Sequence, residues 1–361
     1  MLELQKIHDI FRSAPQINLK NTRIHWKKVA IFLLFELIFS AITAPVILFY
    51  GPFENIKSVV VGSLYTTYSH KYMAEFFLSQ GAIERIISMD GYYNKSEVAQ
   101  DEKPSEQPVH DINIKASHSD KVTLTYINGG RSFQGYLINI DDPTIVKVAT
   151  SEKLPIEGER ASTIAKRHKA ITAINAGGFT YSESWSSTGG AYEGFIIQDG
   201  KVTGNVYPDE DTLDDAIGFT DKGQLIFGRY SVNDLKMKNV KEAICFFGPK
   251  LIVNGKKMFL PGETGGLGIA PRTAIGQKAN GEVLFLNVDG RDLLGSLGAT
   301  MYDLQEILYK QGVVNAINLD GGSSSAMYYE GKIINRQTNS VGERTIPSIF
   351  MVSPGEDGEK K

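Results

Sequence analysis

The sequence contains a single cysteine and has no strong excess of charge of either sign. Cys245 has no partner for an intramolecular disulfide and cannot form a cysteine-based zinc site, and its apolar neighbours favour a buried core residue. The 38 basic and 41 acidic residues give a formal net charge of −3, which argues against a strongly basic, nucleic-acid-binding surface. With 42% hydrophobic residues in 361, the composition excludes a disordered chain and predicts at least one large globular domain.

One long apolar run lies near the N-terminus, at residues 29–50. As a helix it would be about 33 Å long, enough to cross the hydrocarbon core of a bilayer, with Glu36 as its only charged residue. Residues 1–28 carry six basic and two acidic side chains, and basic flanks stay in the cytoplasm. We therefore predict an uncleaved signal-anchor that crosses the cell membrane once, with the N-terminus cytoplasmic and the rest of the chain extracytoplasmic. A cleaved signal peptide is the alternative.

The chain beyond the anchor divides by composition into a helical segment, a linker and a large domain. Residues 55–89 place apolar side chains at spacings of three and four, which predicts a helical stalk over 51–93, or a helix that lies near the membrane surface. Residues 94–118 are polar and contain no aromatic side chain, as expected of a linker, and residues 354–361 form a polar tail. The catalytic candidate is therefore residues 119–353, and we expect it to fold without the segments that precede it.

Within this large domain, strand-like runs alternate with turns and short helices. Residues 300–310 have the pattern of a helix that ends at Gly312, and the apolar run 313–319 predicts a buried strand. Turn sequences such as Asn280-Gly281 separate further pairs of strand-like runs. The mixture predicts an α+β domain with a mixed α/β sheet, and not a doubly wound nucleotide-binding fold.

Four segments share one design, an apolar strand that ends in glycine and polar side chains. A strand end lets polar side chains leave the core while the sheet fixes their positions, and glycine lets the backbone approach a ligand closely. Together the four segments predict a shared cleft. They are INAGGF at 174–179, APRTAIG at 270–276, NVDGR at 287–291 and NLDGGSSSAM at 318–327.

These motifs, with NSVGERTIPSIFMV at 339–352, resemble the phosphodiester glycosidase family over about residues 120–353. Members of that family cleave the bond between the anomeric carbon of a sugar and a phosphodiester oxygen, and the animal member removes N-acetylglucosamine from a phosphodiester on mannose. The resemblance implies a bacterial, membrane-anchored hydrolase that acts on a sugar-1-phosphodiester, such as that of N-acetylglucosamine, in a cell-envelope or exopolysaccharide glycopolymer. Ser323 departs from the family pattern, which often has glycine there.

Such a reaction needs a carboxylate near the anomeric carbon, either to stabilise positive charge or to activate water. Asp289 and Asp320 each follow an apolar strand, and Glu343 lies in the closing motif, so these three are the catalytic candidates. The sequence does not identify the base or decide between a retaining and an inverting mechanism. For Glu343, an ion pair with Arg344 or another arginine is the alternative.

A phosphodiester keeps a negative charge, and arginine binds phosphate oxygens through two parallel hydrogen bonds. Arg272, Arg291 and Arg344 lie in the matching motifs and are the candidates for that contact. Surface solvation or structural ion pairing is the alternative for each. Further candidates for contacts with the sugar or phosphate of the glycan are Asn175, Gly178, Thr273, Gly290, Gly321, Gly322, Ser323 and Ser324.

Two other functions compete with phosphodiester hydrolysis. One is a non-catalytic, membrane-anchored module for glycan binding or exopolysaccharide assembly. The other is a serine hydrolase, because residues 322–326 are similar to the nucleophile-elbow sequence of such enzymes. In that fold the catalytic histidine follows the serine in the sequence, whereas the last histidine here, His168, precedes it. No cofactor is expected. The alternative is a Ca²⁺ or Mg²⁺ site formed by Asp289, Asp292 and Asp320, although the sequence contains no EF-hand-like loop.

The predicted topology can be tested by proteolysis of intact cells. Added protease should digest the large domain and leave the N-terminal 28 residues protected, because the anchor places them on opposite sides of the membrane. Antibodies against tags at the two ends would identify the products. Protection of the large domain would contradict the orientation, and a mature chain that begins near Gly51 would contradict an uncleaved anchor.

Overall fold

The computed structural model describes residues 26–65, 70–89, 122–129, 133–180, 188–292, 295–338 and 342–353. The chain divides into two compact units, Met1–Pro52 and Phe53–Lys361, which are described separately. Residues 1–25 of the expected cytoplasmic segment, the linker 94–118 and the tail 354–361 lie outside the described residues.

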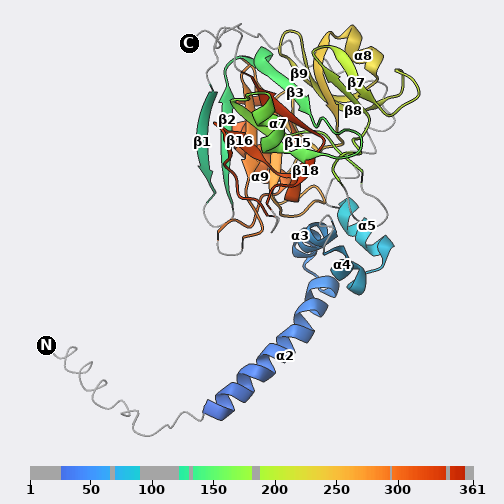
Figure 1. Cartoon of the computed structure of the whole chain (residues 1–361). Coiled ribbons are helices and arrows are strands. Elements are labelled where there is room, and N and C mark those ends of the chain that lie inside the picture. Colours follow the sequence, from blue (N-terminus) through green and yellow to red (C-terminus); the bar gives the residue numbers. More distant parts are fainter. Residues whose placement is uncertain are drawn as a thin grey trace, which may run out of the picture. The chain divides into compact units, whose positions relative to one another are not determined.

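The first unit contributes helix α2, Trp26–Tyr50, which contains the expected anchor and the internal proline Pro45 (Figure 1). Its apolar side chains are exposed along the helix; Ile31 and Leu37, for example, are each 68% exposed. A helix of 25 residues is about 37 Å long. By length and composition this helix can cross a membrane, and a signal sequence near an N-terminus has the same properties.

The second unit begins with three short helices in the segment expected to form a stalk. They are α3 (Glu54–Tyr65), α4 (Lys71–Phe77) and α5 (Gln80–Met89). The three helices pack against one another, and Val61, Ala74 and Ile83 are fully buried. This part of the chain is therefore a small folded group, and α3 also contacts Ile269 of the large domain.

A seven-stranded sheet, in which every neighbouring pair is antiparallel, is the largest layer of the second unit. Helix α9 (Met301–Lys310) covers one face of it through apolar side chains such as Leu304 and Leu308. In sheet order the strands are β1 (Val122–Asn128), β2 (Gln134–Ile140), β14 (Val283–Val288), β13 (Arg272–Lys278), β15 (Val313–Leu319), β11 (Lys250–Val253) and β12 (Lys256–Lys257).

Two five-stranded sheets and a two-stranded one accompany the seven-stranded sheet. The first contains β7 (Lys201–Asn205), β6 (Phe195–Gln198), β10 (Val240–Cys245), β8 (Asp214–Thr220) and β9 (Leu225–Tyr230), with α8 (Val232–Met237) packed on it. The second contains β17 (Lys332–Ile333), β16 (Met327–Tyr329), β5 (Thr172–Asn175), β19 (Ser348–Val352) and β3 (Val146–Thr150), with α7 (Ala161–Arg167) packed on it. The two-stranded sheet pairs β18 (Thr345–Ile346) with β4 (Glu159–Arg160), and the 3-10 turns are η1 (Pro143–Ile145) and η2 (Gly322–Ser324).

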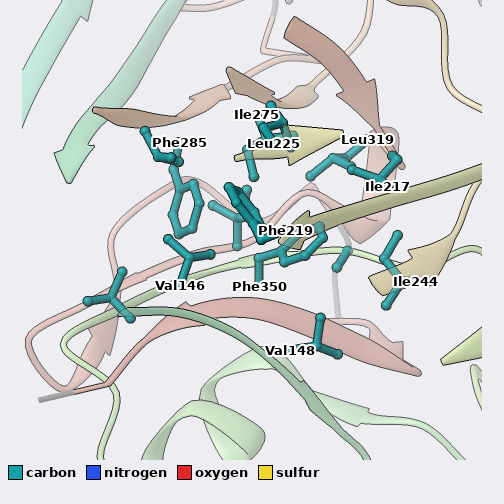
Figure 2. Close-up of a cluster of buried hydrophobic side chains, with 14 of the residues drawn as sticks. Val146, Val148, Ile217, Phe219, Leu225, Ile244, Ile275, Phe285, Leu319 and Phe350 are labelled. Carbon is teal, nitrogen blue, oxygen red and sulfur yellow. The ribbon is translucent and has the colours of Figure 1, made fainter. Parts of the chain in front are cut away.

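The three larger sheets share one apolar core (Figure 2). Phe285 comes from the seven-stranded sheet, Phe219 from the first five-stranded sheet and Phe350 from the second, and all three are buried. The rings of Phe219 and Phe350 meet edge to face, with their centroids 5.9 Å apart. This shared core holds the strand ends of three sheets at fixed positions, which a site built from strand ends requires.

The described elements confirm the expected α+β class and several of its predicted parts. Helix α9 matches the helix predicted over residues 300–310. The Thr300 hydroxyl accepts the backbone N–H of Asp303, and the Asp303 carboxylate accepts the N–H of Thr300, so a capping box starts the helix. Strand β15 coincides with the predicted buried strand 313–319.

The shared core predicts a large stability cost for truncating Phe350. Phe350→Ala should lower the free energy of unfolding by about 3–5 kcal/mol, because the substitution removes buried surface and leaves a cavity. Met237→Ala is the control, since Met237 is 76% exposed and should change stability little. Denaturant unfolding of the full chain in detergent would measure both, and equal losses would contradict the described core.

Candidate active site

Strands β13 and β15 bring two of the glycine-rich segments side by side. They pair antiparallel with Thr273 opposite Leu319, so the start of β13 lies beside the end of β15. Arg272 and Asp320 are therefore neighbours, and the positive charge of Arg272 favours the ionised form of Asp320. The backbone of the NVDGR segment also approaches, because a Cβ added to Gly290 would lie only 2.6 Å from the nitrogen of residue 271.

The fourth segment is joined to the others by the side chain of Asn175, the last residue of β5. Its amide nitrogen donates to the carbonyl oxygen of Asp320 at 2.7 Å. Its amide oxygen accepts the Thr273 hydroxyl at 2.8 Å and the backbone N–H of Ala326 at 3.0 Å, while Thr273 accepts from the side-chain amide of Asn287 at 3.1 Å. Asn175 is 1% exposed, so these contacts serve to fix the loop that follows β15.

Asp320 is the carboxylate on which these segments converge. Its side chain accepts the backbone N–H of Gly321 at 2.9 Å and interacts with the hydroxyl of Ser324. Burial raises the pKa of Asp320, while the Ser324 hydroxyl and the charges of Arg344 and Arg272 act in the opposite direction. The residue as a whole is intermediate in its exposure to solvent.

Two of the candidate phosphate-binding arginines lie against the loop that follows β15. Arg344 donates to the hydroxyl of Ser323 at 3.2 Å, and its guanidinium lies over the ring of Phe179, 4.8 Å from the centroid. Arg291 lies beside Gly322, because a Cβ added to that glycine would be 3.3 Å from one of its guanidinium nitrogens. Both cations therefore flank the Gly-Gly-Ser-Ser turn.

Arg272 is held more deeply and is only 5% exposed. One terminal nitrogen donates to the carbonyl oxygens of Leu267 at 2.7 Å and Gly268 at 3.0 Å, and Nε donates to that of Ala299 at 3.3 Å. Burial, together with repulsion from Arg291, lowers the pKa of Arg272 to about 10. The guanidinium therefore stays charged at neutral pH and has a fixed position.

The Asp289 side chain is engaged with a different part of the chain. Its carboxylate accepts the backbone N–H of Arg336 at 2.9 Å, and the Arg336 side chain forms an ion pair with Asp292. Burial raises the pKa of Asp289, and the contact with Arg336 opposes that shift. Within the part of the chain that the structure describes, no group of three or more His, Cys, Asp or Glu side chains has the arrangement of a metal site.

Glu343 lies at the start of helix α7. Its two carboxylate oxygens accept the backbone N–H of Ser162 at 2.9 Å and the Ser162 hydroxyl at 2.6 Å. A carboxylate at the N-terminus of a helix accepts hydrogen bonds from N–H groups that have no partner within the helix. Its negative charge also interacts favourably with the positive end of the helix dipole. This placement favours a structural role for Glu343. It differs from the ion pair with an arginine that the sequence suggested as the alternative.

The structure adds one carboxylate that sequence reasoning missed, Glu193. Its backbone N–H donates to the carbonyl oxygen of Gly178 at 3.1 Å, and a Cβ added to Gly178 would lie 2.3 Å from the Glu193 carboxylate. Burial raises the pKa of Glu193, and the negative charges of Asp214 and Asp320 raise it further. Glu193 therefore lies near Asp320. The signal in the sequence was the glycine-flanked GGAYEG at 189–194, which, unlike the four strand ends, precedes an apolar strand.

Glu193 also borders a pocket of about 710 Å³. The hydroxyl of Tyr207 donates to Asp214 at 2.6 Å in its wall, and Tyr192, Asn205 and Thr180 also line it. The described lining residues include two carboxylates and no basic side chain. Hydroxyl, amide and carboxylate groups beside aromatic rings form a surface that suits a neutral sugar.

Residues 168–353, slightly more than half of the chain, match the family model described as phosphodiester glycosidase. The chain belongs to this family. The match includes all four glycine-rich strand ends, the closing motif and Glu193. It confirms the family resemblance seen in the sequence, and it supports a hydrolase that acts on phosphodiester-linked sugars.

Two relatives with similar sequences differ in how much of their length they share with this chain. The SPbeta prophage-derived uncharacterized protein YomE of Bacillus subtilis is 31% identical over 228 residues, which cover 61% of this chain and 33% of that protein. The N-acetylglucosamine-1-phosphodiester alpha-N-acetylglucosaminidase of Bos taurus is 42% identical over 65 residues, 18% of this chain and 12% of that enzyme. The chain thus spans a third or less of the length of these relatives.

A solved structure shows the same fold as this member of the family. The catalytic domain of the zebrafish N-acetylglucosamine-1-phosphodiester alpha-N-acetylglucosaminidase, auto-inhibited by its pro-peptide, aligns with a TM-score of 0.53 and 22% identity. The alignment covers 68% of this chain and 87% of that chain.

The environment of Glu193 predicts a pH-dependent effect on stability. A folded-state pKa above the unfolded value means that ionisation is disfavoured in the fold, so stability is lost as the pH rises through the folded-state pKa. Glu193→Gln should therefore stabilise the chain at pH 7, and the gain should vanish below about pH 4, where both states are protonated. Thermal unfolding at the two pH values would measure this, and destabilisation at pH 7 would contradict the described surroundings.

Proposed function

We propose that this chain is an extracytoplasmic glycoside hydrolase that releases a sugar from a sugar-1-phosphodiester. The observation that carries the proposal is the arrangement of charge. Arg272, Arg291 and Arg344 lie around the loop of Asp320, whereas Glu193 borders an acidic pocket beside it. Fixed cations for a phosphodiester next to carboxylates for an anomeric carbon are the two requirements of this reaction.

The charges also orient the substrate. The phosphodiester would lie at the arginines, since Arg272 is buried with a fixed charge and the other two cations flank the turn at Ser323. The sugar would extend towards the pocket, because Glu193 and Asp214 repel a phosphate but accept hydrogen bonds from hydroxyl groups. The anomeric carbon then comes between the two regions, near Asp320 and Glu193.

This orientation assigns separate tasks to the two carboxylates. Burial raises the pKa of Asp320, and Ser324, Arg344 and Arg272 oppose that shift; in its ionised form Asp320 stabilises positive charge on the anomeric carbon. Glu193, whose pKa is raised, accepts a proton from the attacking water, because a base works best with a pKa near the working pH. The water oxygen bonds to the anomeric carbon, the bond from that carbon to the phosphate ester oxygen breaks, and its electron pair leaves with a phosphate monoester.

The substrate and location extend the proposal further. The bovine relative is named for an N-acetylglucosamine-1-phosphodiester, so we propose N-acetylglucosamine as the sugar to test first. Helix α2, preceded by six basic residues in 1–28, would anchor the chain in the cell membrane and place the domain outside. A phosphodiester-linked glycan of the cell envelope or of an exopolysaccharide is then the accessible substrate.

One assay tests the proposed function, the release of N-acetylglucosamine from its methyl α-1-phosphodiester by the full chain in detergent. Asp320→Asn and Glu193→Gln should each lower kcat about 100-fold or more, because each removes a charge that acts on the transition state. Asp289→Asn should cost less, since that carboxylate holds the backbone of Arg336. Full activity of the Asp320 and Glu193 variants would contradict the mechanism.

The substitution Arg272→Lys tests the proposed contact with the phosphate. It keeps the positive charge but loses the hydrogen bonds to the Leu267, Gly268 and Ala299 carbonyls that fix the position of that charge, so kcat/KM should fall roughly 5- to 150-fold, equivalent to about 1–3 kcal/mol. Ser324→Ala is the matched control, because loss of one hydrogen bond to Asp320 should cost about 0.5–1.5 kcal/mol.

The same assay separates the competing functions. Abolished activity in Ser324→Ala, with a covalent serine adduct in the unmutated chain, would favour a serine hydrolase. A chain that binds the diester but releases no sugar would favour a non-catalytic glycan-binding module.

A further inference from the structure

The carbonyl groups that hold Arg272 belong to a glycine-rich loop, residues 264–269. Its Gly265, Gly266 and Gly268 all have positive φ, between 62° and 72°, a backbone region that other residues rarely adopt. The Arg272 guanidinium donates to the carbonyl oxygens of Leu267 and Gly268. Because the carbonyl positions depend on the path of this loop, the direction of the guanidinium depends on it as well.

Helix α3, in the segment expected to be a separate stalk, lies directly against this loop. The Ser63 hydroxyl accepts the backbone N–H of Ile269 at 2.9 Å and donates to the carbonyl oxygen of Val59 within its own helix at 2.6 Å. A Cβ added to Gly62 would lie 2.8 Å from the carbonyl oxygen of Gly266 and 2.9 Å from the nitrogen of Gly268. The backbones of helix and loop therefore meet at Gly62 with no side chain between them.

Other contacts near Gly62 hold both the helix and the loop in place. Val61, next to Gly62, is 0% exposed, and α3 packs against α4 and α5. On the loop, Thr264 is also 0% exposed, and its hydroxyl accepts the backbone N–H of Gly268 at 3.3 Å. A displaced α3 would therefore leave the amide of Ile269 without its acceptor and remove one wall of the loop.

We propose that helix α3 is a positioning element for the active-site arginine Arg272. It holds the loop 264–269 in the conformation in which the Leu267 and Gly268 carbonyls direct the guanidinium. The inference rests on the proposed function, in which Arg272 binds the phosphodiester. It also assigns helix α3 a part in the site, which a chain reduced to residues 119–353 would lack.

The test compares Gly62→Ala with Gly81→Ala in the full chain. Both glycines lie in helices of the same group, but nothing lies within 4 Å of a Cβ added to Gly81. Gly62→Ala should weaken the binding of inorganic phosphate, measured by calorimetry, about 10-fold or more and raise KM for the phosphodiester equally. Gly81→Ala should leave both unchanged, and inhibition by free N-acetylglucosamine, which does not contact Arg272 in the proposed orientation, should be unchanged in both.

A second pair of variants covers the outcome in which Gly62→Ala fails to fold. Ser63→Ala removes the acceptor for the Ile269 N–H without adding atoms, and it should weaken phosphate binding about 2- to 10-fold, the equivalent of one hydrogen bond. Ser63→Thr keeps the hydroxyl and should restore affinity. Amide hydrogen exchange over residues 264–269 should accelerate in Ser63→Ala and not in Ser63→Thr.

The readouts separate this inference from the proposed function. If the unmutated chain releases no sugar, yet both Gly62→Ala and Ser63→Ala weaken phosphate binding, the proposed reaction is wrong and the positioning role stands. If phosphate affinity and loop exchange are the same in Ser63→Ala and the unmutated chain, or the unmutated chain binds no phosphate, the positioning role is wrong.

Discussion

The buried side chain of Asn175 joins strand β5 of one sheet to the neighbouring ends of β13 and β15 in another. Its amide nitrogen holds the carbonyl of Asp320, and its amide oxygen accepts the Thr273 hydroxyl and the Ala326 N–H. A buried amide left without partners would cost about 1–3 kcal/mol, so the bonded geometry is strongly preferred. Because this amide holds the backbone of Asp320 at the start of the loop, the positions of the carboxylate and of the Gly-Gly-Ser-Ser turn both depend on it.

The site also contains several charged side chains in a buried environment that disfavours their ionised forms. Arg272 is nearly fully buried, its pKa is lowered to about 10, and Arg291 repels it, while burial raises the pKa of both Asp320 and Glu193. Carbonyl oxygens from the loop 264–269 compensate the guanidinium, and the cations compensate Asp320. Burying these charges is costly, and in the proposed function the negative charge of a bound phosphodiester would offset the positive charge of the arginines.

Local sequence signals predicted much of the fold and the segments that form the site. The helix at 300–310 has its capping residue Thr300 and its glycine stop within the chain itself, so no distant contact was needed to find it. All four glycine-rich segments meet around the loop of Asp320, because glycine and polar residues after an apolar run mark strand ends whichever sheets they join. The neighbours of each carboxylate could not be predicted in this way, since they come from other segments of the chain, 47 residues away for Asp289 and Arg336 and 181 for Glu343 and Ser162.

The sequence by itself determined the family, the α+β class, one apolar helix long enough to span a membrane, and the motifs that carry arginine and aspartate. Only the tertiary structure decided which side chains meet. It placed Glu193 near Asp320, directed Glu343 to the first turn of α7, and put the backbone of α3 at Gly62 against the loop that holds Arg272. Helix caps, turns and apolar periodicity act over a few residues and can be read along the chain, whereas burial, electrostatic neighbours and backbone-to-backbone contact arise only when distant segments pack together.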